Sequence, residues 1–163
     1  MLNAISKSGG EKLSNEKARI LIVDDDPSIT EALKIILEAR GYKVDTAHTG
    51  KEAIKKSETK IYNLALLDIR LPDMEGTKLL KAIRETSPKM VKIMLTGYPQ
   101  LQNAIEALND GADAYFVKPA DPAKLLKTIE EKLLEQNEEK EVTEEKLAKF
   151  LKTRTEKLLQ ELE

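Results

Sequence analysis

Carboxylate, hydroxyl and amine side chains stand at the ends of short apolar runs in this sequence. They are Asp24 and Asp25 after the run 20–23, Asp68 after 64–67, Thr96 after 91–95 and Lys118 after 114–117. A single acidic residue at such a place most often caps a helix or forms a turn. Three carboxylates gathered at one site repel each other, yet together they offer hard oxygen ligands for a divalent cation, and Mg²⁺ is the natural candidate.

The charges of this group come close to balancing once a cation is included. The three aspartates are negative, while Mg²⁺ and Lys118 together supply the same amount of positive charge. A phosphoryl group could then be held between the metal ion and the lysine, with Thr96 donating a hydrogen bond to a phosphoryl oxygen. Phosphoryl transfer mainly requires positioning and charge neutralisation from a protein, and a carboxylate is an accepted nucleophile for it.

These side chains can meet only if the apolar runs form neighbouring strands. Short continuous apolar runs are typical of strands buried on both faces. Five such strands alternate with five helical segments: strands 20–23, 43–47, 62–67, 91–95 and 114–117, and helices 28–40, 51–58, 76–86, 100–109 and 122–136. Strict alternation predicts an α/β fold with a parallel sheet and helices on both faces. Ligands of such folds bind beyond the carboxyl ends of the strands, where the five polar residues lie.

The first helical segment shows how the sequence marks the ends of its helices. Ser28 is the expected N-cap, and Ile29 and Leu33 begin an apolar stripe at helical spacing. Gly41 follows as the expected C-terminal stop. The helix should therefore fill the connection between the first two strands.

Four segments of the chain resemble the signature segments of the receiver domain of two-component response regulators. They are ILIVDDDP, LALLDIRLPDMEG, IMLTGY and YFVKP, in the order and spacing of that family, and the resemblance covers residues 19–135. It implies a doubly wound five-stranded parallel sheet in the order 2-1-3-4-5, flanked by five helices, and the chain adds a C-terminal helical extension.

The resemblance also assigns expected roles to residues around the acidic group. Asp68 matches the phosphoacceptor, and Asp25 matches the residue that binds Mg²⁺ directly. Asp24 would contribute charge to the pocket, often through water, and Arg70 would contribute its backbone carbonyl to the metal ion. Asp26, next in the chain, is expected to be a loop and capping residue instead of a ligand.

Three further residues match family residues that contact the phosphoryl group or move in response to it. Lys118 matches the lysine that contacts it, followed by Pro119 with an expected cis bond. Thr96 matches the switch hydroxyl, and Tyr115 matches the aromatic residue that turns inward when the hydroxyl moves.

Residues near the pocket receive simpler interpretations. The single histidine, His48, has no second His or Cys nearby and is expected to be an exposed loop residue. Arg70 and Tyr98 flank the pocket, where their side chains could shield an acyl phosphate from water. Met74 and Gly76 are expected to shape the loop after Asp68.

Composition limits the remaining choices. The chain has 163 residues, 27 basic and 29 acidic, a formal net charge of -2, and no cysteine. This balance does not favour direct binding to nucleic acid or to a membrane, and the lack of cysteine excludes disulfides and thiolate metal sites. Neither a secretion signal nor a membrane span is recognisable, so a cytoplasmic location is expected. We expect a flexible leader at 1–17, the receiver domain at 18–136 and a charged helical tail at 137–163.

The tail leaves two interpretations open. Thr143 is expected to cap a separate helix, stapled by Val142 and Leu147. One side of this helix carries a leucine stripe that Arg154 interrupts: Leu147, Leu151, Leu158 and Leu162. The stripe is compatible with a coiled coil or signalling linker, and equally with a solvated helix packed on its own domain.

The leading hypothesis is a phosphorylation switch without multiple-turnover enzyme activity. A sensor histidine kinase, a phosphotransfer protein or a small acyl phosphate would phosphorylate Asp68. Thr96 and Tyr115 would then rearrange, and the face formed by residues 100–109, 114–117 and 122–136 would change its partner preference. A homodimer through that face or through the C-terminal helix is one expected outcome.

Two other function classes remain as alternatives. An aspartyl-phosphate phosphatase is one, but such enzymes place a second Asp two residues after the nucleophile, where this chain has Arg70. A receiver-like adaptor that no longer switches is the other. The chain could be a single-domain regulator or the front part of a longer one, and its tail has too few residues for an ordinary output domain.

Overall fold

The structure is a computed structural model that describes residues 18–97 and 101–163. The predicted leader at 1–17 and Tyr98 therefore lie outside the described residues. Among the described residues, no helix combines the length and apolar character that a membrane crossing requires.

Five parallel strands form one sheet in the order β2-β1-β3-β4-β5, which confirms the predicted doubly wound α/β fold. The strands are β1 (Arg19–Val23), β2 (Lys43–Ala47), β3 (Leu64–Leu67), β4 (Val91–Thr96) and β5 (Ala114–Val117). The third strand begins two residues later than predicted. Its register places Leu67 beside both Val23 of β1 and Met94 of β4, so β1 and β3 end level and β4 continues two residues further, to Thr96.

Five helices connect and follow the strands: α2 (Pro27–Glu38), α3 (Gly50–Thr59), α4 (Gly76–Thr86), α5 (Leu101–Asn109) and α6 (Pro122–Leu162). The N-cap of α2 is Asp26, which confirms the capping role expected for this residue, whereas the expectation that Ser28 is the N-cap was wrong. The Asp26 carboxylate accepts hydrogen bonds from the backbone N–H and the hydroxyl of Ser28, and Pro27 begins the helix. At the other end, Gly41 has a φ of 92°, which suits a glycine after a helix.

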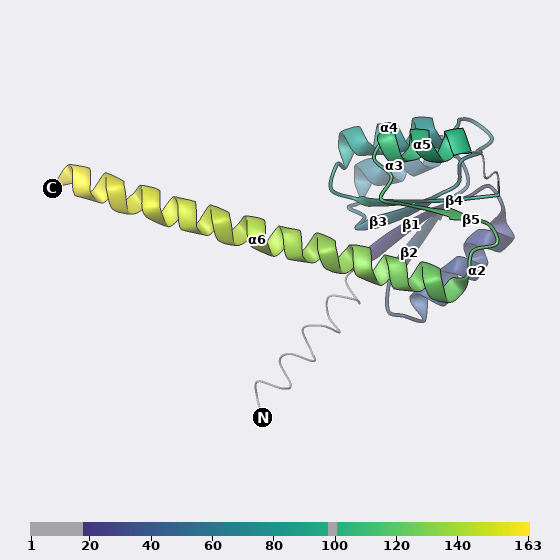
Figure 1. The fold of residues 1–163 in the computed structure, drawn as a ribbon, viewed down its shortest axis with the longest axis horizontal. Helices are drawn as coiled ribbons and strands as arrows, with labels where there is room; N and C mark the ends of the chain where they lie inside the picture. Colours follow the sequence, from purple (N-terminus) through teal and green to yellow (C-terminus); the bar gives the residue numbers. More distant parts are fainter. Residues whose placement is uncertain (1–17, 98–100) are drawn as a thin grey trace, which may run out of the picture.

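The helices cover the two faces of the sheet, as Figure 1 shows. Helices α3, α4 and α5 lie over one face, where Leu67, Leu80 and Met94 belong to one buried cluster. Helices α2 and α6 lie over the other face, where Ile22 and Ile129 belong to a second buried cluster. The strands are buried on both faces, in agreement with their continuous apolar sequences.

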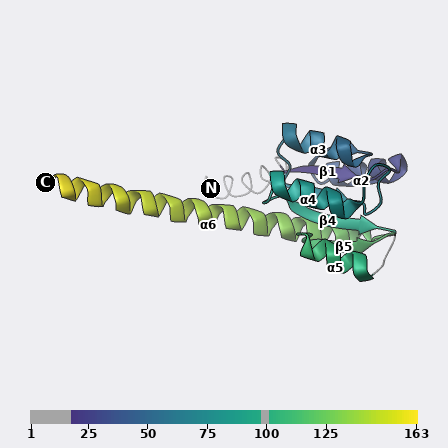
Figure 2. The same cartoon turned by 90° about the horizontal axis from the view of Figure 1, so that it is seen from above.

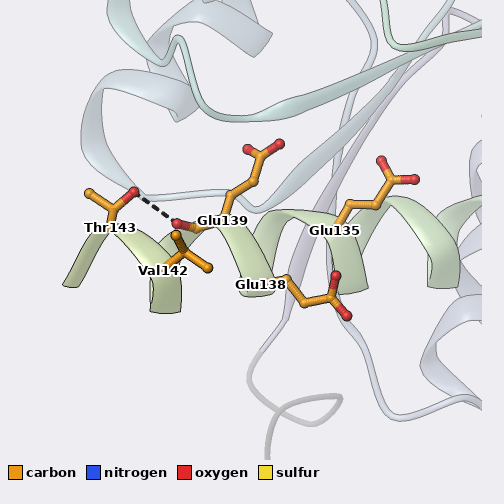
Figure 3. A pocket seen from close by; sticks show the side chains of 5 residues that line it. All are labelled: Glu135, Glu138, Glu139, Val142 and Thr143. Carbon is orange, nitrogen blue, oxygen red and sulfur yellow. Dashed lines mark hydrogen bonds between the residues drawn. The ribbon is translucent and has the colours of Figure 1, made fainter. Parts of the chain in front are cut away.

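Helix α6 is the main departure from the sequence prediction. It runs without a break for 41 residues, from Pro122 to Leu162, and its distal part projects away from the sheet (Figures 1 and 2). Thr143 therefore does not cap a separate helix. Its hydroxyl lies in mid-helix and donates to the backbone carbonyl of Glu139 at 2.8 Å (Figure 3).

The last tertiary anchor of α6 that we identify is Gln136. Its side-chain amide donates to the carbonyl oxygens of Asn63 and Lys89, each at 2.9 Å, at the amino-terminal end of β3 and β4. Every residue from 137 to 163 is exposed. The interpretation of the tail as a helix packed on its own domain is therefore wrong.

Candidate phosphoryl-acceptor site

The hydrogen-bond ladder of the sheet continues past the ends of its strands and carries the predicted residues to one edge. The backbone N–H of Asp24 donates to the last residue of β2 at 3.1 Å, and that of Asp68 donates to the last residue of β1 at 3.0 Å. On the other side of the pocket, the N–H of Lys118 donates to the carbonyl oxygen of Thr96 at 2.7 Å. Backbone pairing therefore fixes these positions independently of their side chains.

Asp24, Asp25 and Asp68 form a carboxylate cluster. One oxygen from each lies within 4.8 Å of the others. Asp24 and Asp68 are 3% and 6% exposed, whereas Asp25 is exposed. The strand-end positions predicted that the three carboxylates gather at one edge, and the structure shows that two of them are buried and the third is accessible.

Lys118 lies beside the two buried carboxylates, Asp24 and Asp68. Its ammonium group pairs with the carboxylate of Asp24 and lies 3.3 Å from Oδ2 of Asp68. The peptide bond between Lys118 and Pro119 is cis, as expected. The lysine thus contacts the carboxylate that is expected to accept the phosphoryl group.

The pKa values of these groups reflect competing effects. Burial raises the pKa of the Asp68 carboxyl, and the nearby charge of Asp24 raises it further, while Lys118 opposes the shift. Burial alone would lower the pKa of Lys118, but its hydrogen bonds and charge interactions with the two aspartates outweigh that effect and raise it. The lysine therefore stays charged, and Asp68 lies in a site that penalises uncompensated negative charge.

The donor set of the cluster fits a hard divalent cation. All three groups are carboxylates, which are ligands of Mg²⁺ and Ca²⁺. Two of them are buried, and Lys118 supplies one positive charge against three negative ones. Buried charge without compensation is costly, so the excess favours a cation at this position.

Thr96 and Tyr115 lie on β4 and β5, and β4 is the neighbour of the strand that Asp68 follows. Thr96 is completely buried at the end of β4. Tyr115 packs partly buried against the cluster under α4 and α5, and its hydroxyl is buried with no hydrogen-bond partner among the described residues. The ring therefore points inward in this structure.

The loop after Asp68 is held close to the site by backbone contacts. The N–H of Arg70 lies 3.4 Å from Oδ1 of Asp68, and Arg70 forms an isolated bridge with Glu75. The side chain of Arg70 is exposed. At Gly76, a Cβ atom would lie 2.3 Å from the carbonyl oxygen of Asp68 and 2.6 Å from Cα of Ile69. Only glycine fits there without a backbone shift, which explains how Gly76 shapes this loop.

Met74 helps to seat the same loop against α3. A Cβ atom at Gly50 would lie 2.4 Å from Sδ of Met74, so the absence of a side chain at Gly50 makes room for the methionine. Met74 packs partly buried against the core beneath α3 and α4. Both residues therefore have packing roles, as expected for Met74.

Sequence reasoning missed the role of Asp73. Its carboxylate accepts hydrogen bonds from the N–H groups of Gly50 and Lys51, at 2.8 and 2.9 Å, and these bonds lower its pKa. Asp73 thereby ties the loop after Asp68 to the amino terminus of α3. An aspartate in a turn gives no local signal of a partner more than 20 residues away.

The expectation for His48 was wrong. The residue is half-buried, not exposed, and its Nδ1 lies 3.0 Å from the backbone carbonyl oxygen of Asp24. The N–H of His48 donates to the carboxylate of Glu52, while Thr49 accepts from the N–H of Glu52. The sequence Thr-Gly-Lys-Glu at 49–52 is a capping-box signal that could have predicted the bond between Thr49 and the N–H of Glu52. The Glu52 carboxylate, however, binds the N–H of His48.

Comparisons with known proteins agree with this fold. The model of the response regulator receiver domain matches residues 20–130. A crystal structure of a CheY-like receiver domain protein from Methanospirillum hungatei JF-1 is 53% identical, with a TM-score of 0.74 over 75% of this chain and 98% of that chain. A two-component response regulator from Clostridium difficile is 33% identical, with a TM-score of 0.72 over 74% of this chain and 99% of that one. The chain belongs to the response regulator receiver domain family.

Curated relatives include longer proteins. The transcriptional regulatory protein ZraR of Klebsiella oxytoca is 38% identical over 85% of this chain and 31% of its own length. DltR of Streptococcus agalactiae, also a transcriptional regulatory protein, is 39% identical over 68% of this chain and 50% of its own length. The chain thus spans 31% to 50% of the length of these relatives.

Proposed function

We propose that Asp68 accepts a phosphoryl group and that its phosphorylation switches the receiver domain between two signalling states. The observation that carries this proposal is the environment of one carboxylate. Asp68 is 6% exposed, faces the ammonium group of Lys118 at 3.3 Å, and shares a cluster with Asp24 and Asp25. This arrangement suits an anionic group that arrives together with a cation.

The transfer step uses the chain's own groups in defined roles. A carboxylate oxygen of Asp68 forms the new bond to phosphorus, and the bond between phosphorus and the donor breaks. The electron pair of that bond leaves with the donor, a histidine nitrogen of a kinase or phosphotransfer protein or an oxygen of a small acyl phosphate. Lys118 and Thr96 would bind the phosphoryl oxygens. The protein acts as an acceptor with slow self-dephosphorylation, and not as a multiple-turnover enzyme.

The acidic cluster is the proposed Mg²⁺ site. Asp25, Asp68 and the backbone carbonyl of Arg70 would bind the ion directly, and Asp24 would bind it through water. When bound, Mg²⁺ supplies positive charge that neutralises the phosphoryl oxygens. Asp25 is the exposed member of the cluster, so it lies where the ion would enter.

The proposed switch runs from Thr96 to the surface of α5, β5 and α6. Movement of the Thr96 hydroxyl toward the phosphoryl group would allow the Tyr115 ring to move with it, and the face that these elements form would change its partners. Tyr115 supports this proposal because its hydroxyl is already buried beside the core.

The partners in this proposal are a sensor histidine kinase or phosphotransfer protein as donor, in the cytoplasm, and a second copy of the chain. A beryllofluoride-activated dimer is described for the NtrC4 receiver domain, which is 38% identical with a TM-score of 0.69 over 72% of this chain and 98% of that one. For our protein, we propose dimerisation through the α5, β5 and α6 face or through distal α6. We propose no direct contact with nucleic acid, because glutamate outnumbers lysine and arginine in residues 137–163.

Acetyl phosphate with Mg²⁺, followed by intact-mass measurement, tests the acceptor. Wild type should gain the mass of one phosphoryl group, and Asp68→Asn should gain none. Asp110→Asn is the matched control, since it removes a carboxylate that pairs with Lys81 outside the cluster. Equal labelling of wild type and Asp68→Asn would refute the assignment.

A further inference from the structure

The distal part of α6 has an apolar side that no described part of the chain covers. Between Leu147 and Leu162, five large apolar side chains on this side are 48% to 83% exposed: Leu147, Phe150, Leu151, Leu158 and Leu162. Exposed apolar residues in such a contiguous stripe usually mark an interaction surface. The stripe is compatible with a second helix, because its seam positions recur at coiled-coil spacing.

The seam contains charged residues that discriminate between possible partner orientations. At alternating steps of three and four residues, the seam runs Glu144, Leu147, Leu151, Arg154 and Leu158. In a parallel in-register pair, every seam residue faces its own copy. Arg154 would then face Arg154 of the partner subunit, and Glu144 would face Glu144 of the partner subunit, so two layers would place like charges together.

An antiparallel pair centred on Lys149 reverses the sign of both interactions. Glu144 then faces Arg154 of the partner subunit, and the twofold axis repeats this pair on the other side of the centre. Leu147 faces Leu151 of the partner subunit, which places two leucine layers between the two ion pairs. This centre thus gives both opposite charges and apolar contact at the seam. A shift of one heptad moves the centre to a point between residues 152 and 153. Glu144 would then lie opposite Glu161 of the partner subunit, so like charges would face each other.

Residues beside the seam fit the same centre. Phe150 lies next to the twofold axis, close to Phe150 of the partner subunit. Phe150, Leu147 and Leu151 therefore gain cover in the pair, and Leu158 is covered by the stem of Lys140 of the partner subunit.

The attachment of α6 to its own domain also fits this centre. Pairing about Lys149 places residue 162 opposite Gln136, where α6 leaves the domain. A centre one heptad earlier would place residue 162 opposite Ile129, which is completely buried in the core of its own domain.

We propose that two copies of this chain associate through the distal half of α6 as an antiparallel helix pair centred on Lys149. The surface hollow lined by Glu135, Glu138, Glu139, Val142 and Thr143 (Figure 3) lies mainly on the outer side of this pair, so its glutamates stay in water. The proposal builds on the dimer suggested above and selects its surface and orientation. It requires no phosphoryl group, and its tests are done in an Asp68→Asn background so that it can fail separately.

Cross-linking tests the orientation cleanly because the chain has no cysteine. Lys140→Cys and Leu158→Cys are made separately, since these positions face each other in the antiparallel pair. Their mixture should form a disulfide-linked dimer under mild oxidation. Each variant alone should not, because equivalent positions lie about 27 Å apart along the pair. Strong cross-linking of Leu158→Cys alone would indicate a parallel pair and overturn the proposal, as would the absence of any cross-link.

Charge reversal tests the registry in the full chain by sedimentation equilibrium. Glu144→Arg and Arg154→Glu should each raise the dimer Kd about tenfold or more, and the double variant should restore it. Glu145→Arg and Lys152→Glu are matched controls one position off the seam and should leave Kd within about threefold. A weak pair would have a Kd in the micromolar range, and roughly 0.1 mM protein is about 100 times such a Kd. A wild type that is still monomeric at this concentration would overturn the proposal. So would charge reversals that act no more strongly than their controls.

Discussion

At the scale of single residues, the pocket combines groups that do not all satisfy one another. Asp24 and Asp68 are buried together, and one ammonium group, that of Lys118, lies between them. A protein selected only for stability would have little reason to bury two carboxylates beside each other. Their arrangement is explained by the cation and phosphoryl group that we propose for the site.

Tyr115 offers a test of the inward orientation of its ring. Its hydroxyl is buried without a hydrogen-bond partner among the described residues, and such a group typically costs about 1–3 kcal/mol. Tyr115→Phe removes the hydroxyl and keeps the ring, so it should raise the free energy of unfolding by roughly 1 kcal/mol. Urea denaturation without Mg²⁺ measures the change. A clear loss of stability would show that the hydroxyl has a partner in solution.

Asp45 gives a prediction for the pH dependence of stability. Partial burial alone would raise its pKa, but hydrogen bonds from Tyr62 and Lys60, with the charges of Lys60 and Arg19, lower it below the usual value. A carboxyl whose pKa is lower in the folded than in the unfolded state stabilises the fold above its unfolded pKa. That stabilisation is lost as the pH falls through the folded pKa.

Asp45→Asn should therefore destabilise the protein at pH 7 by up to about 1 kcal/mol, since solvent screens these partly exposed pairs. The difference from wild type should shrink between pH 4 and pH 3, about where an aspartate becomes protonated. Urea denaturation at both pH values provides the measurement. A difference that grows on acidification would contradict the assigned direction.

The predictable part of the site is the part fixed by strand ends. Asp24, Asp68 and Lys118 follow apolar runs whose strand character is evident, and parallel strands necessarily bring their carboxyl ends to one edge. The contacts of His48 and Asp73 depend on how loops return across that edge. The spacing of residues along the sequence does not indicate how these loops fold back. The environment of His48 was therefore misjudged, and the contacts of Asp73 were missed.

At the scale of elements, the loop between β3 and α4 depends on one close approach. A side chain at Gly76 would meet the backbone of Asp68 and Ile69 and not a flexible side chain. Gly76→Ala should therefore cost about 1–3 kcal/mol, as overpacking does. It should also slow phosphorylation by acetyl phosphate, because it displaces the carbonyl of Arg70.

Gly97→Ala is the matched control for this prediction. Gly97 also borders the pocket, just after Thr96, but a Cβ atom there meets nothing within 4 Å among the described residues. Its stability should change by less than about 0.5 kcal/mol. Equal effects of the two substitutions would mean that the close approach at Gly76 is not what matters.

Helix α6 shows why element boundaries are harder to predict than element types. Thr143 followed by glutamates looks like a helix start, and the same residues are also compatible with the interior of a helix. In the structure, the Thr143 hydroxyl donates to the carbonyl of Glu139 one turn earlier, so Thr143 lies inside the helix. Gln136, in the turn before Glu139, is hydrogen-bonded to the carbonyl of Asn63. The helical character of both halves was predictable, whereas their fusion was not.

Truncation should separate the two halves of α6. A chain that ends after Glu138 keeps Gln136 and loses only exposed residues, so its free energy of unfolding per domain should fall by less than about 1 kcal/mol at concentrations where both chains are monomeric. Ile129→Ala is the contrasting variant, because Ile129 is completely buried and its truncation should cost about 2–5 kcal/mol. Thermal and urea unfolding measure both. A truncated domain that fails to fold would show that the distal helix supports the receiver.

At the scale of the whole molecule, the described residues form a receiver domain and a helix that projects from it (Figure 2). An antiparallel pair of these helices would place the two receivers at opposite ends. Their α5, β5 and α6 faces would then be free to bind other partners when Asp68 is phosphorylated. Small-angle X-ray scattering should show a markedly elongated dimer, and a compact dimer with adjoining receivers would contradict this arrangement.

The most direct measurement for the central claim locates the phosphoryl group on the chain. Wild type is phosphorylated with acetyl phosphate and Mg²⁺, reduced with borohydride to convert the acyl phosphate to a stable alcohol, digested and mapped by mass spectrometry. We predict that the modification lies at Asp68 and is absent when Mg²⁺ is removed. Modification at Asp24, Asp25 or any residue outside the pocket, in place of Asp68, would contradict the account.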